Sequence, residues 1–434
     1  MSNFAGQAVS RSATSWFNRG AGSAAPVSIA DTSAASSKSW ALRLLVLFLL
    51  VMYSSIGALV PATNSLRPAM IIASAAIVMM IIEISRNGTR FRLAWPETPM
   101  LIGLLGVAGI SMFDAIYVRQ GFETTSNFGK IVLIYVVIEN TVSSTNRLRV
   151  VLLAMIAGGL MPALGTMHHF LTGRLVEQTR AAWVGVFANP NEDAYSLAIL
   201  VPLAAAVAST SRWWLRVALW GVIGAYILAI FLTFSRGGLL GLFAIVALLG
   251  WKQRSVVLKT LMIAGLVAGI VAVSVFWARR DTFNDISQDT TFNQRIATMK
   301  AGIAMFNDHP LLGIGPGCSI VGYPLYVPKE AHCGCQDQLV VHNAFIQILS
   351  ETGVMGFIPF MVLLGGALLH ARKLQRTDSS ELKAYATGLE VALWGFVVCG
   401  LSGGFSWSWF PYIIVGLIVA GKHIADNATE ARLP

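Results

Sequence analysis

Arg236 is the residue whose type and surroundings point most directly to chemistry. It stands in Ser235-Arg236-Gly237-Gly238, at the junction of two long apolar segments. A guanidinium held in a tight turn that the glycines permit can bind phosphate through several donors at once. The alternative is an arginine whose head extends to the lipid headgroups. The first interpretation predicts a site for a phosphorylated substrate at this junction.

Several further arginines are expected on the same side of the membrane as Arg236. They are Arg174, Arg180, Arg279, Arg280 and Arg295. Arg180 comes shortly before an Asn-Pro-Asn turn, and Arg295 lies on an amphipathic segment, whereas the 279–280 pair ends an apolar run and suits an interface anchor. Such a cluster favours an anionic, lipid-linked substrate, especially a diphosphate.

His342 is the candidate for acid–base chemistry. It opens the segment HNAFIQILSETG at the end of the longest polar stretch of the chain. An imidazole there can titrate near neutral pH and accept a proton from a hydroxyl, although a purely structural histidine is the alternative. Asn343 is expected to cap a short helix that runs to Glu351 and stops at Gly353.

Two asparagines flank Pro190 in a turn that leads into an apolar segment. Asn189 and Asn191 break regular structure here, and Asp193 is a reasonable helix start. The spacing favours a helix cap over a sugar-binding role, so we treat both asparagines, together with Asn343, as weak candidates for substrate binding.

Three of the four cysteines lie in one polar stretch. A disulfide between Cys318 and either Cys333 or Cys335 is plausible in an oxidising compartment. The neighbouring His332 makes a metal site conceivable but disfavoured, and the spacing of the histidines predicts none elsewhere. Cys399 lies within an apolar run and is expected to behave as a small apolar residue.

The composition indicates which elements must position these residues. Of 434 residues, 55% are hydrophobic and only 12% are charged, against about a quarter charged in soluble domains. Apolar runs long enough to cross a bilayer recur without strand-like alternation, so the predicted class is all-α and polytopic. The net charge of +10 does not indicate nucleic-acid binding, because the lysines and arginines are scattered through short loops.

The apolar runs predict about twelve transmembrane helices. They lie near 41–60, 69–85, 98–117, 128–141, 148–170, 193–209, 213–233, 237–250, 258–277, 354–370, 385–402 and 408–422. With the N-terminus inside, every short cytoplasmic loop is basic, which places both termini in the cytoplasm. Arg236 and His342 then face the periplasm.

This span pattern divides the chain into five parts. They are a disordered cytoplasmic tail (1–38), helices 1–9 (39–277), a large periplasmic loop with an amphipathic helix at 291–306 (278–353), helices 10–12 (354–422) and a cytoplasmic tail (423–434). A loop of that length in a bundle with short connections is usually functional.

Ionisable residues inside the predicted spans help to distinguish an enzyme from a transporter. Glu83, Asp114, Glu139 and Glu390 are all expected near span ends. A proton-coupled transporter would normally place such groups near the midplane, so their positions disfavour transport.

Four motifs in order resemble the O-antigen ligase and polymerase superfamily of bacterial membrane glycosyltransferases. They are FANPNEDAYSLA (187–198), LTFSRGG (232–238), NQRIATMKAGIAMFNDHPLLGIGPG (293–317) and VHNAFIQILSETGVMGF (341–357). The resemblance covers roughly 185–360 by motif and the whole chain by span pattern.

The resemblance implies a GT-C-like fold and metal-independent transfer of a glycan from undecaprenyl diphosphate, with no cofactor. Arg236 and Arg295 match the arginines that hold the donor diphosphate, Arg180 matches them more weakly, and His342 matches the essential histidine. The cysteines have no counterpart in the family pattern.

The resemblance leaves the acceptor open. In the ligase branch it is a sugar hydroxyl on the lipid A core, and in the polymerase branch it is a growing polysaccharide chain. A ligase at the inner membrane is the first expectation, a polymerase the alternative, and a transporter of lipid-linked oligosaccharide the second alternative. Membrane lipid is an expected partner, and nucleic acid is not.

Overall fold

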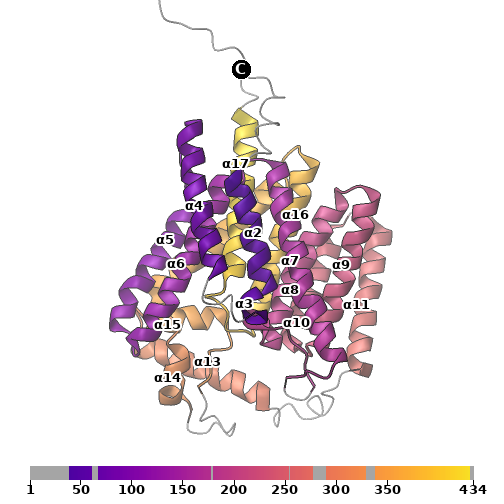
Figure 1. Ribbon diagram of the computed structural model, residues 1–434. Helices are drawn as coiled ribbons and strands as arrows, with labels where there is room; N and C mark the ends of the chain where they lie inside the picture. Colours follow the sequence, from indigo (N-terminus) through magenta and orange to yellow (C-terminus); the bar gives the residue numbers. More distant parts are fainter. Residues whose placement is uncertain are drawn as a thin grey trace, which may run out of the picture. The chain divides into compact units, whose positions relative to one another are not determined.

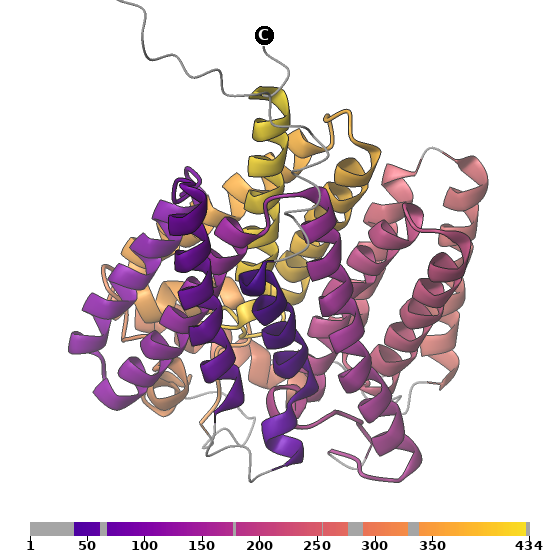
Figure 2. The same cartoon turned by 45° about the horizontal axis from the view of Figure 1, so that its top comes forward.

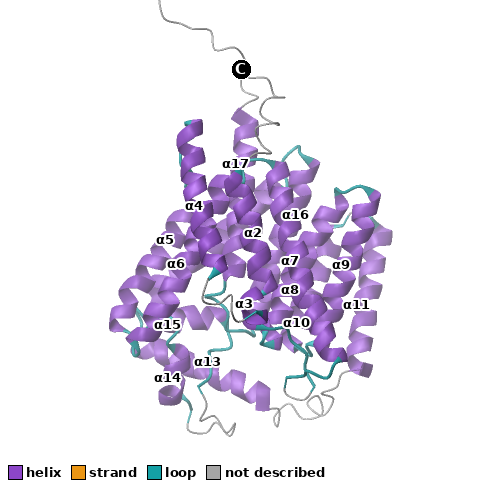
Figure 3. Ribbon diagram, viewed as in Figure 1, coloured by secondary structure: helices purple, strands orange, loops and turns teal. Residues whose placement is uncertain are grey.

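The computed structural model describes residues 39–60, 67–176, 179–253, 255–276, 290–328 and 338–430. Contact clustering separates Met1–Ser39 from a unit that spans Trp40–Pro434, and the elements below all belong to the second unit. In the described ranges the chain forms helices joined by loops, with no strand and one isolated β-bridge between Val176 and Arg180 (Figure 3). The all-α prediction is confirmed, whereas the expected tail at 1–38 lies outside the described residues.

The helices follow the predicted spans closely. In chain order they are α2 (Trp40–Ser54), α3 (Ile56–Leu59), α4 (Pro68–Asn87), α5 (Glu97–Ser111), η3 (Met112–Asp114), α6 (Val118–Thr141), α7 (Thr145–Leu171), η4 (Gly185–Phe187), α8 (Pro190–Ser209), α9 (Trp213–Leu232), α10 (Arg236–Lys252), α11 (Val256–Phe276), α13 (Thr290–Asp308), α14 (Ser319–Tyr326), α15 (Ala344–Leu374), α16 (Ser380–Gly400) and α17 (Trp409–Glu430). The amphipathic helix expected at 291–306 is present as α13. The last helix continues to Glu430, beyond the predicted end of the twelfth span.

Seven described helices are long and apolar enough to cross a membrane. They lie at Pro68–Asn87, Glu97–Asp114, Thr145–Leu171, Pro190–Ser209, Trp213–Leu232, Ala344–Leu374 and Ser380–Gly400. Trp40–Ser54 and Val256–Val271 are shorter apolar helices. The chain is therefore a multi-pass membrane protein, and the count of twelve spans stays a prediction.

The spanning helices of this unit group around α8, α16 and α17. In Figures 1 and 2, α4–α6 lie on one side of α17 and α9–α11 on the other. The helices α8 and α16 pack closely, because a Cβ on Gly388 would lie only 2.6 Å from that of Ala206. Figure 1 also shows α13 crosswise at one end of the helices. We call this the His342 end, because His342 lies there, directly before α15.

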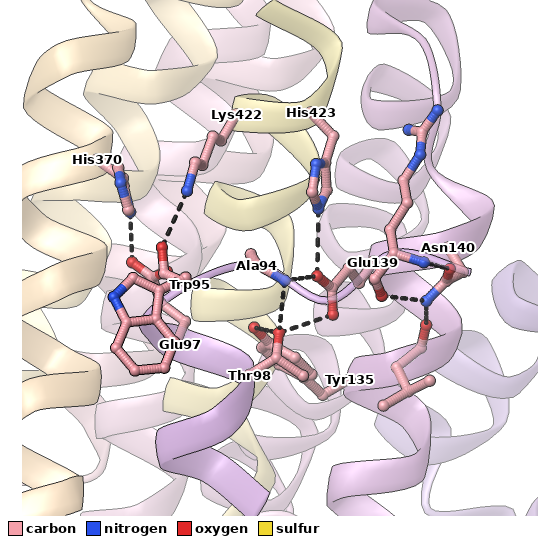
Figure 4. Close-up of polar contacts among 12 residues, drawn as sticks. Ala94, Trp95, Glu97, Thr98, Tyr135, Glu139, Asn140, His370, Lys422 and His423 are labelled. Carbon is pink, nitrogen blue, oxygen red and sulfur yellow. Dashed lines mark hydrogen bonds and ion pairs between the residues drawn. The ribbon is translucent and has the colours of Figure 1, made fainter. Parts of the chain in front are cut away.

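The end opposite His342 is held by a buried polar network (Figure 4). The carboxylate of Glu139 is fully buried and accepts hydrogen bonds from Ala94 N at 2.5 Å and the Thr98 hydroxyl at 2.9 Å. His423 Nε2 lies 3.2 Å from the same carboxylate. His370 Nδ1 pairs in the same region with the buried Glu97. These contacts join α5, α6, α15 and α17, and so they fix α15, whose other end begins directly after His342 and Asn343.

Glu390 departs from its predicted place. It lies in the middle of α16 rather than near an end. Its buried carboxylate is bound by Lys252 Nζ at 2.6 Å and Arg372 Nε at 2.9 Å. Because a buried charge needs such partners, this glutamate has a structural role in joining α10, α15 and α16.

The helix that begins after His342 breaks where the sequence predicts. Gly353 has φ 60° and ψ −166° inside α15, a conformation that side chains disfavour. The chain at 310–315 packs into this break, where Val354 N donates to Pro310 O at 2.9 Å and Ile314 N donates to Ser350 O at 3.0 Å. The break thus anchors the polar segment that precedes His342.

A small second core lies under α13 and α14. It contains Ala301, Met305, Ile314, Cys318 and Tyr323. Cys318 has a free thiol, and burial raises its pKa to about 11. The proposed disulfide partners, Cys333 and Cys335, lie outside the described residues.

Candidate active site

The start of α8 connects two of the predicted site segments. Asn189 is the N-cap, and its side chain accepts a hydrogen bond from Asn191 N at 2.8 Å, so the helix starts there and not at Asp193. The Asn191 side-chain oxygen accepts hydrogen bonds from Arg180 Nη2 at 2.7 Å and the Ser235 hydroxyl at 2.8 Å. Asn191 therefore holds Arg180 against the turn that carries Arg236.

Arg180 is a buried cation. Its side chain is 4% exposed, and its Nε donates to Thr233 O at 3.0 Å. The neighbouring Ala181 N donates to Leu232 O at 3.1 Å. The end of α9 and the residue after it thus supply backbone acceptors to the loop before α8. This arrangement fixes the orientation of the guanidinium and keeps it beside Ser235.

The two glycines after Arg236 permit close packing, not an unusual turn. Both belong to the first turn of α10, whose N-cap Ser235 accepts from Gly238 N at 3.2 Å, and the positive φ of 47° falls on Phe234. A Cβ on Gly237 would lie 2.4 Å from the Tyr195 hydroxyl and from Ser402 Oγ. The predicted role of the glycines is corrected accordingly. Their missing side chains let α10 begin against α8 and the 401–408 segment, with Arg236 at its first position.

Tyr195 occupies the centre of this arrangement. Its hydroxyl bonds to Ser402 O at 3.2 Å and Ser402 Oγ at 3.3 Å. It also lies within electrostatic range of Arg295 and Arg180. Tyr195 therefore lies near the arginines of two separate segments.

The start of α15 supplies His342 and the capping residue Asn343. The Asn343 side-chain oxygen accepts from Phe345 N and Ile346 N at 3.0 Å each, as the prediction of a helix cap requires. Its side-chain nitrogen donates to Leu401 O at 3.3 Å. Asn343 therefore fixes His342 beside the same 401–408 segment that contacts Tyr195.

Helix α13 lies against His342. The Thr298 hydroxyl accepts from His342 N at 3.3 Å and lies 3.5 Å from His342 Nδ1. One turn earlier, Arg295 has a buried Nε that makes no hydrogen bond to any residue the structure describes. The guanidinium and the imidazole are thus neighbours on adjoining elements.

Burial and charge set the protonation of His342. Burial lowers the pKa of the imidazole, the positive charge of Arg295 lowers it further, and a backbone hydrogen bond at Val340 partly opposes both, which leaves it at about 4. The ring is therefore neutral near pH 7. A neutral imidazole is the form that can accept a proton.

The structure thus brings together Arg180, Arg236, Arg295 and His342, with Asn189, Asn191 and Asn343 in capping or bridging roles. The sequence analysis missed Tyr195 and Ser402. Tyr195 follows Asn191 by four residues, the spacing that places two side chains on one helix face, so it could have been found. Ser402 lies in a short connection with no comparable signal.

Glu351 is a further residue that the sequence analysis did not single out. Its fully buried carboxylate accepts hydrogen bonds from Gly317 N at 2.7 Å, Ser319 N at 3.3 Å and Trp407 Nε1 at 2.5 Å. These donors come from the segment before α14 and from the 401–408 segment. Glu351 thus joins both segments to α15, below His342.

Glu351→Gln is expected to destabilise the protein by about 2–3 kcal/mol, because its amide group would face N–H groups that need an acceptor. Thermal unfolding in detergent measures the change, and transfer activity should fall with it. Glu381→Gln is the control, since Glu381 is 37% exposed and lies 3.6 Å from Arg149. Equal melting temperatures for Glu351→Gln and the unmodified protein would contradict the assigned role.

Comparison with known families agrees with the motifs. Residues 221–361 match the family model described as O-antigen ligase, a range that contains Arg236, Arg295 and His342. No curated protein matches the chain. The matched range excludes Arg180, Tyr195 and Ser402, which the structure adds to the same cluster. Residues 221–361 of this multi-pass membrane protein therefore match the O-antigen ligase family, which supports the resemblance that its motifs indicated.

Proposed function

We propose that the protein transfers a glycan from undecaprenyl diphosphate to a sugar hydroxyl of the lipid A core, on the periplasmic side of the bacterial inner membrane. The observation that carries the proposal is a neutral, partly buried His342 next to Arg295, in one cluster with Arg180 and Arg236. A base beside several guanidinium groups suits attack by a hydroxyl on a diphosphate-activated sugar.

His342 acts as the general base in this mechanism. Its Nδ1 faces the Thr298 hydroxyl, which leaves Nε2 to take the proton of the acceptor hydroxyl. The acceptor oxygen bonds to the anomeric carbon as the bond from that carbon to the diphosphate oxygen breaks. The bonding electrons leave with the diphosphate, and a single direct displacement inverts the anomeric configuration.

The arginines stabilise the leaving group. Negative charge develops on the diphosphate oxygens as the bond breaks, and guanidinium groups oriented beforehand stabilise it without a metal ion. Arg180 is oriented by Asn191 and Thr233, and Arg295 has a buried Nε available to an acceptor. Tyr195, whose hydroxyl donates to Ser402 O, lies within electrostatic range of both arginines.

The glycans of a deletion strain test this function. If the protein is a ligase, the strain should accumulate long polyprenyl-linked polymer together with bare lipid A core. The wild-type gene should restore the attachment of polymer to the core, and a gene with His342→Ala should not. Single repeat units on the core would instead indicate a polymerase. Unchanged surface and lipid-linked glycans would contradict both enzymes and favour the transporter.

A further inference from the structure

A second site lies beside the candidate active site. A cavity of about 910 Å³ is enclosed by α2, α3, α4, α6, η4 and the residues that lead into α17. This volume is typical of pockets that hold a small-molecule or lipid ligand. The arginines of the active site and His342 do not line it, so the cavity is a separate binding space.

The lining combines an apolar wall with two cations. Most of its side chains are apolar and come from α2, α4 and α6, while Arg67 and Lys130 supply the charge, and no carboxylate is among the described residues that line the cavity. Lys130 Nζ donates to Asn127 Oδ1 at 2.9 Å. The cavity is therefore positively charged and suits an amphiphile with an anionic head.

Lys130 supports a binding role through its place in the helix. Hydropathy assigned it to the start of the fourth span, but α6 begins at Val118, so Lys130 lies near the middle of the helix. The exposed side chain of Lys130 stands where the polar first half of α6 meets its apolar second half. Here it faces the cavity.

The cavity shares two walls with the active site. Gly185 and Val186 line it from the loop between Arg180 and Asn189. Trp407 lines it from the 401–408 segment, which carries Ser402, and Trp409 lines it from the start of α17. A lipid in the cavity would therefore contact two of the segments that also carry residues of the candidate active site.

We propose that this cavity binds the acceptor lipid, an anionic glycolipid, with its charged head at Arg67 and Lys130 and its chains against α2, α4 and α6. The assignment rests on the proposed function, which requires two substrates. The donor has a single diphosphate, which the arginine cluster accommodates. A second anionic lipid needs cations of its own, and the cavity provides them.

Lipid retention tests the site without any transfer reaction. The full chain is purified, incubated with phosphatidylglycerol or phosphatidylcholine as the probe, and bound lipid is counted by native mass spectrometry. An Arg67→Gln, Lys130→Gln double variant is expected to retain about 10- to 30-fold less phosphatidylglycerol, while phosphatidylcholine binding changes little. Arg174→Gln, an exposed site that does not line the cavity, is the control. Equal retention in the double variant and the control would overturn the site.

A steric variant tests the apolar part independently. Ser74 lines the cavity from α4, whereas Val78, one turn later, is exposed and does not line it. Ser74→Trp is expected to lower retention of both lipids, and Val78→Trp to leave it unchanged. The same effect from both substitutions would contradict binding within the cavity.

Transfer kinetics then identify the occupant. The charge variant should raise KM for the acceptor about tenfold and leave KM for the polyprenyl-linked donor unchanged. A raised donor KM with an unchanged acceptor KM would overturn the acceptor assignment. The protein could retain lipid in a way that depends on Arg67 and Lys130 and yet transfer no glycan. That result would support the lipid site and overturn only the proposed function.

Discussion

Replacing His342 with alanine is expected to reduce glycan transfer by roughly 10²- to 10⁴-fold, the usual effect of losing a general base. The imidazole is neutral and lies beside Arg295, so it is placed to take the proton of a hydroxyl that attacks next to the donor diphosphate. No other histidine occupies an equivalent place in the cluster that the structure describes. Transfer from purified lipid-linked donor to acceptor, at matched protein amounts, measures the effect.

His168→Ala is the matched control, because His168 is an exposed histidine at the end of α7. It should retain nearly full activity. His342→Gln keeps a neutral polar side chain of similar size and should be as inactive as the alanine variant, while its folding is preserved. Normal transfer by either His342 variant would contradict the proposed mechanism.

The same residue sets the acid limit of the reaction. A base works when deprotonated, so kcat/KM, which reports the free enzyme, should fall only as the pH drops through about 4. In the proposed mechanism a bound diphosphate would offset the charge of Arg295 and raise the pKa of His342, so the acid limb of kcat should lie at higher pH. A fall in kcat/KM centred near pH 6.5, the ordinary pKa of histidine, would contradict the lowered pKa of His342.

Stability provides a second readout of His342. Its pKa is lower in the folded protein than in the unfolded chain, so the unfolded chain binds the additional proton. The contribution of the neutral ring to stability is complete above about pH 6.5 and is lost as the pH falls toward 4. The melting temperature of His342→Gln should therefore depend less on pH across this window than that of the unmodified protein.

Arg236→Lys is expected to lower kcat/KM by about 10- to 100-fold although the positive charge remains. A lysine ammonium cannot reproduce the two parallel hydrogen bonds of a guanidinium to adjacent oxygens. Arg236 also occupies the first position of α10, where the helix dipole disfavours a cation and favours an anion. An arginine at that position is consistent with a bound diphosphate.

Arg174→Lys is the control, since Arg174 lies exposed in the loop before Arg180. The loss in Arg236→Lys should appear in the donor kinetics and be independent of acceptor concentration. An Arg236→Lys enzyme with unchanged donor kinetics would remove Arg236 from the diphosphate site. Arg180 and Arg295 would then have to hold the leaving group without it.

Hydropathy located α6 only in part, for a physical reason. The span was predicted at 128–141, but the helix begins at Val118. Its first half is polar, and it is held by the segment before α14, where Ile116 N donates to Ile314 O at 3.0 Å. A Cβ on Gly317 would lie 2.1 Å from the Thr124 hydroxyl, which shows how closely the two segments approach. Such contacts leave no periodic signal in the sequence.

The sequence by itself determined the features that depend on local chemistry. Apolar runs specify membrane helices, the Asn343 side chain caps the helix that follows it, and Gly353 provides the conformation that interrupts α15. These features arise from a few consecutive residues, so a local pattern is enough to predict them. The same holds for α13, whose helical spacing of apolar residues was visible.

Only the tertiary structure decided how the site is assembled. Tyr195 meets Ser402 across 207 positions of the chain, and Glu351 meets Trp407 across 56. Arg180 and Ser235 share the Asn191 side chain because three loops converge at one end of the bundle. Packing of distant helices determines these contacts and the neutral state of His342, since burial and the approach of Arg295 depend on which elements become neighbours.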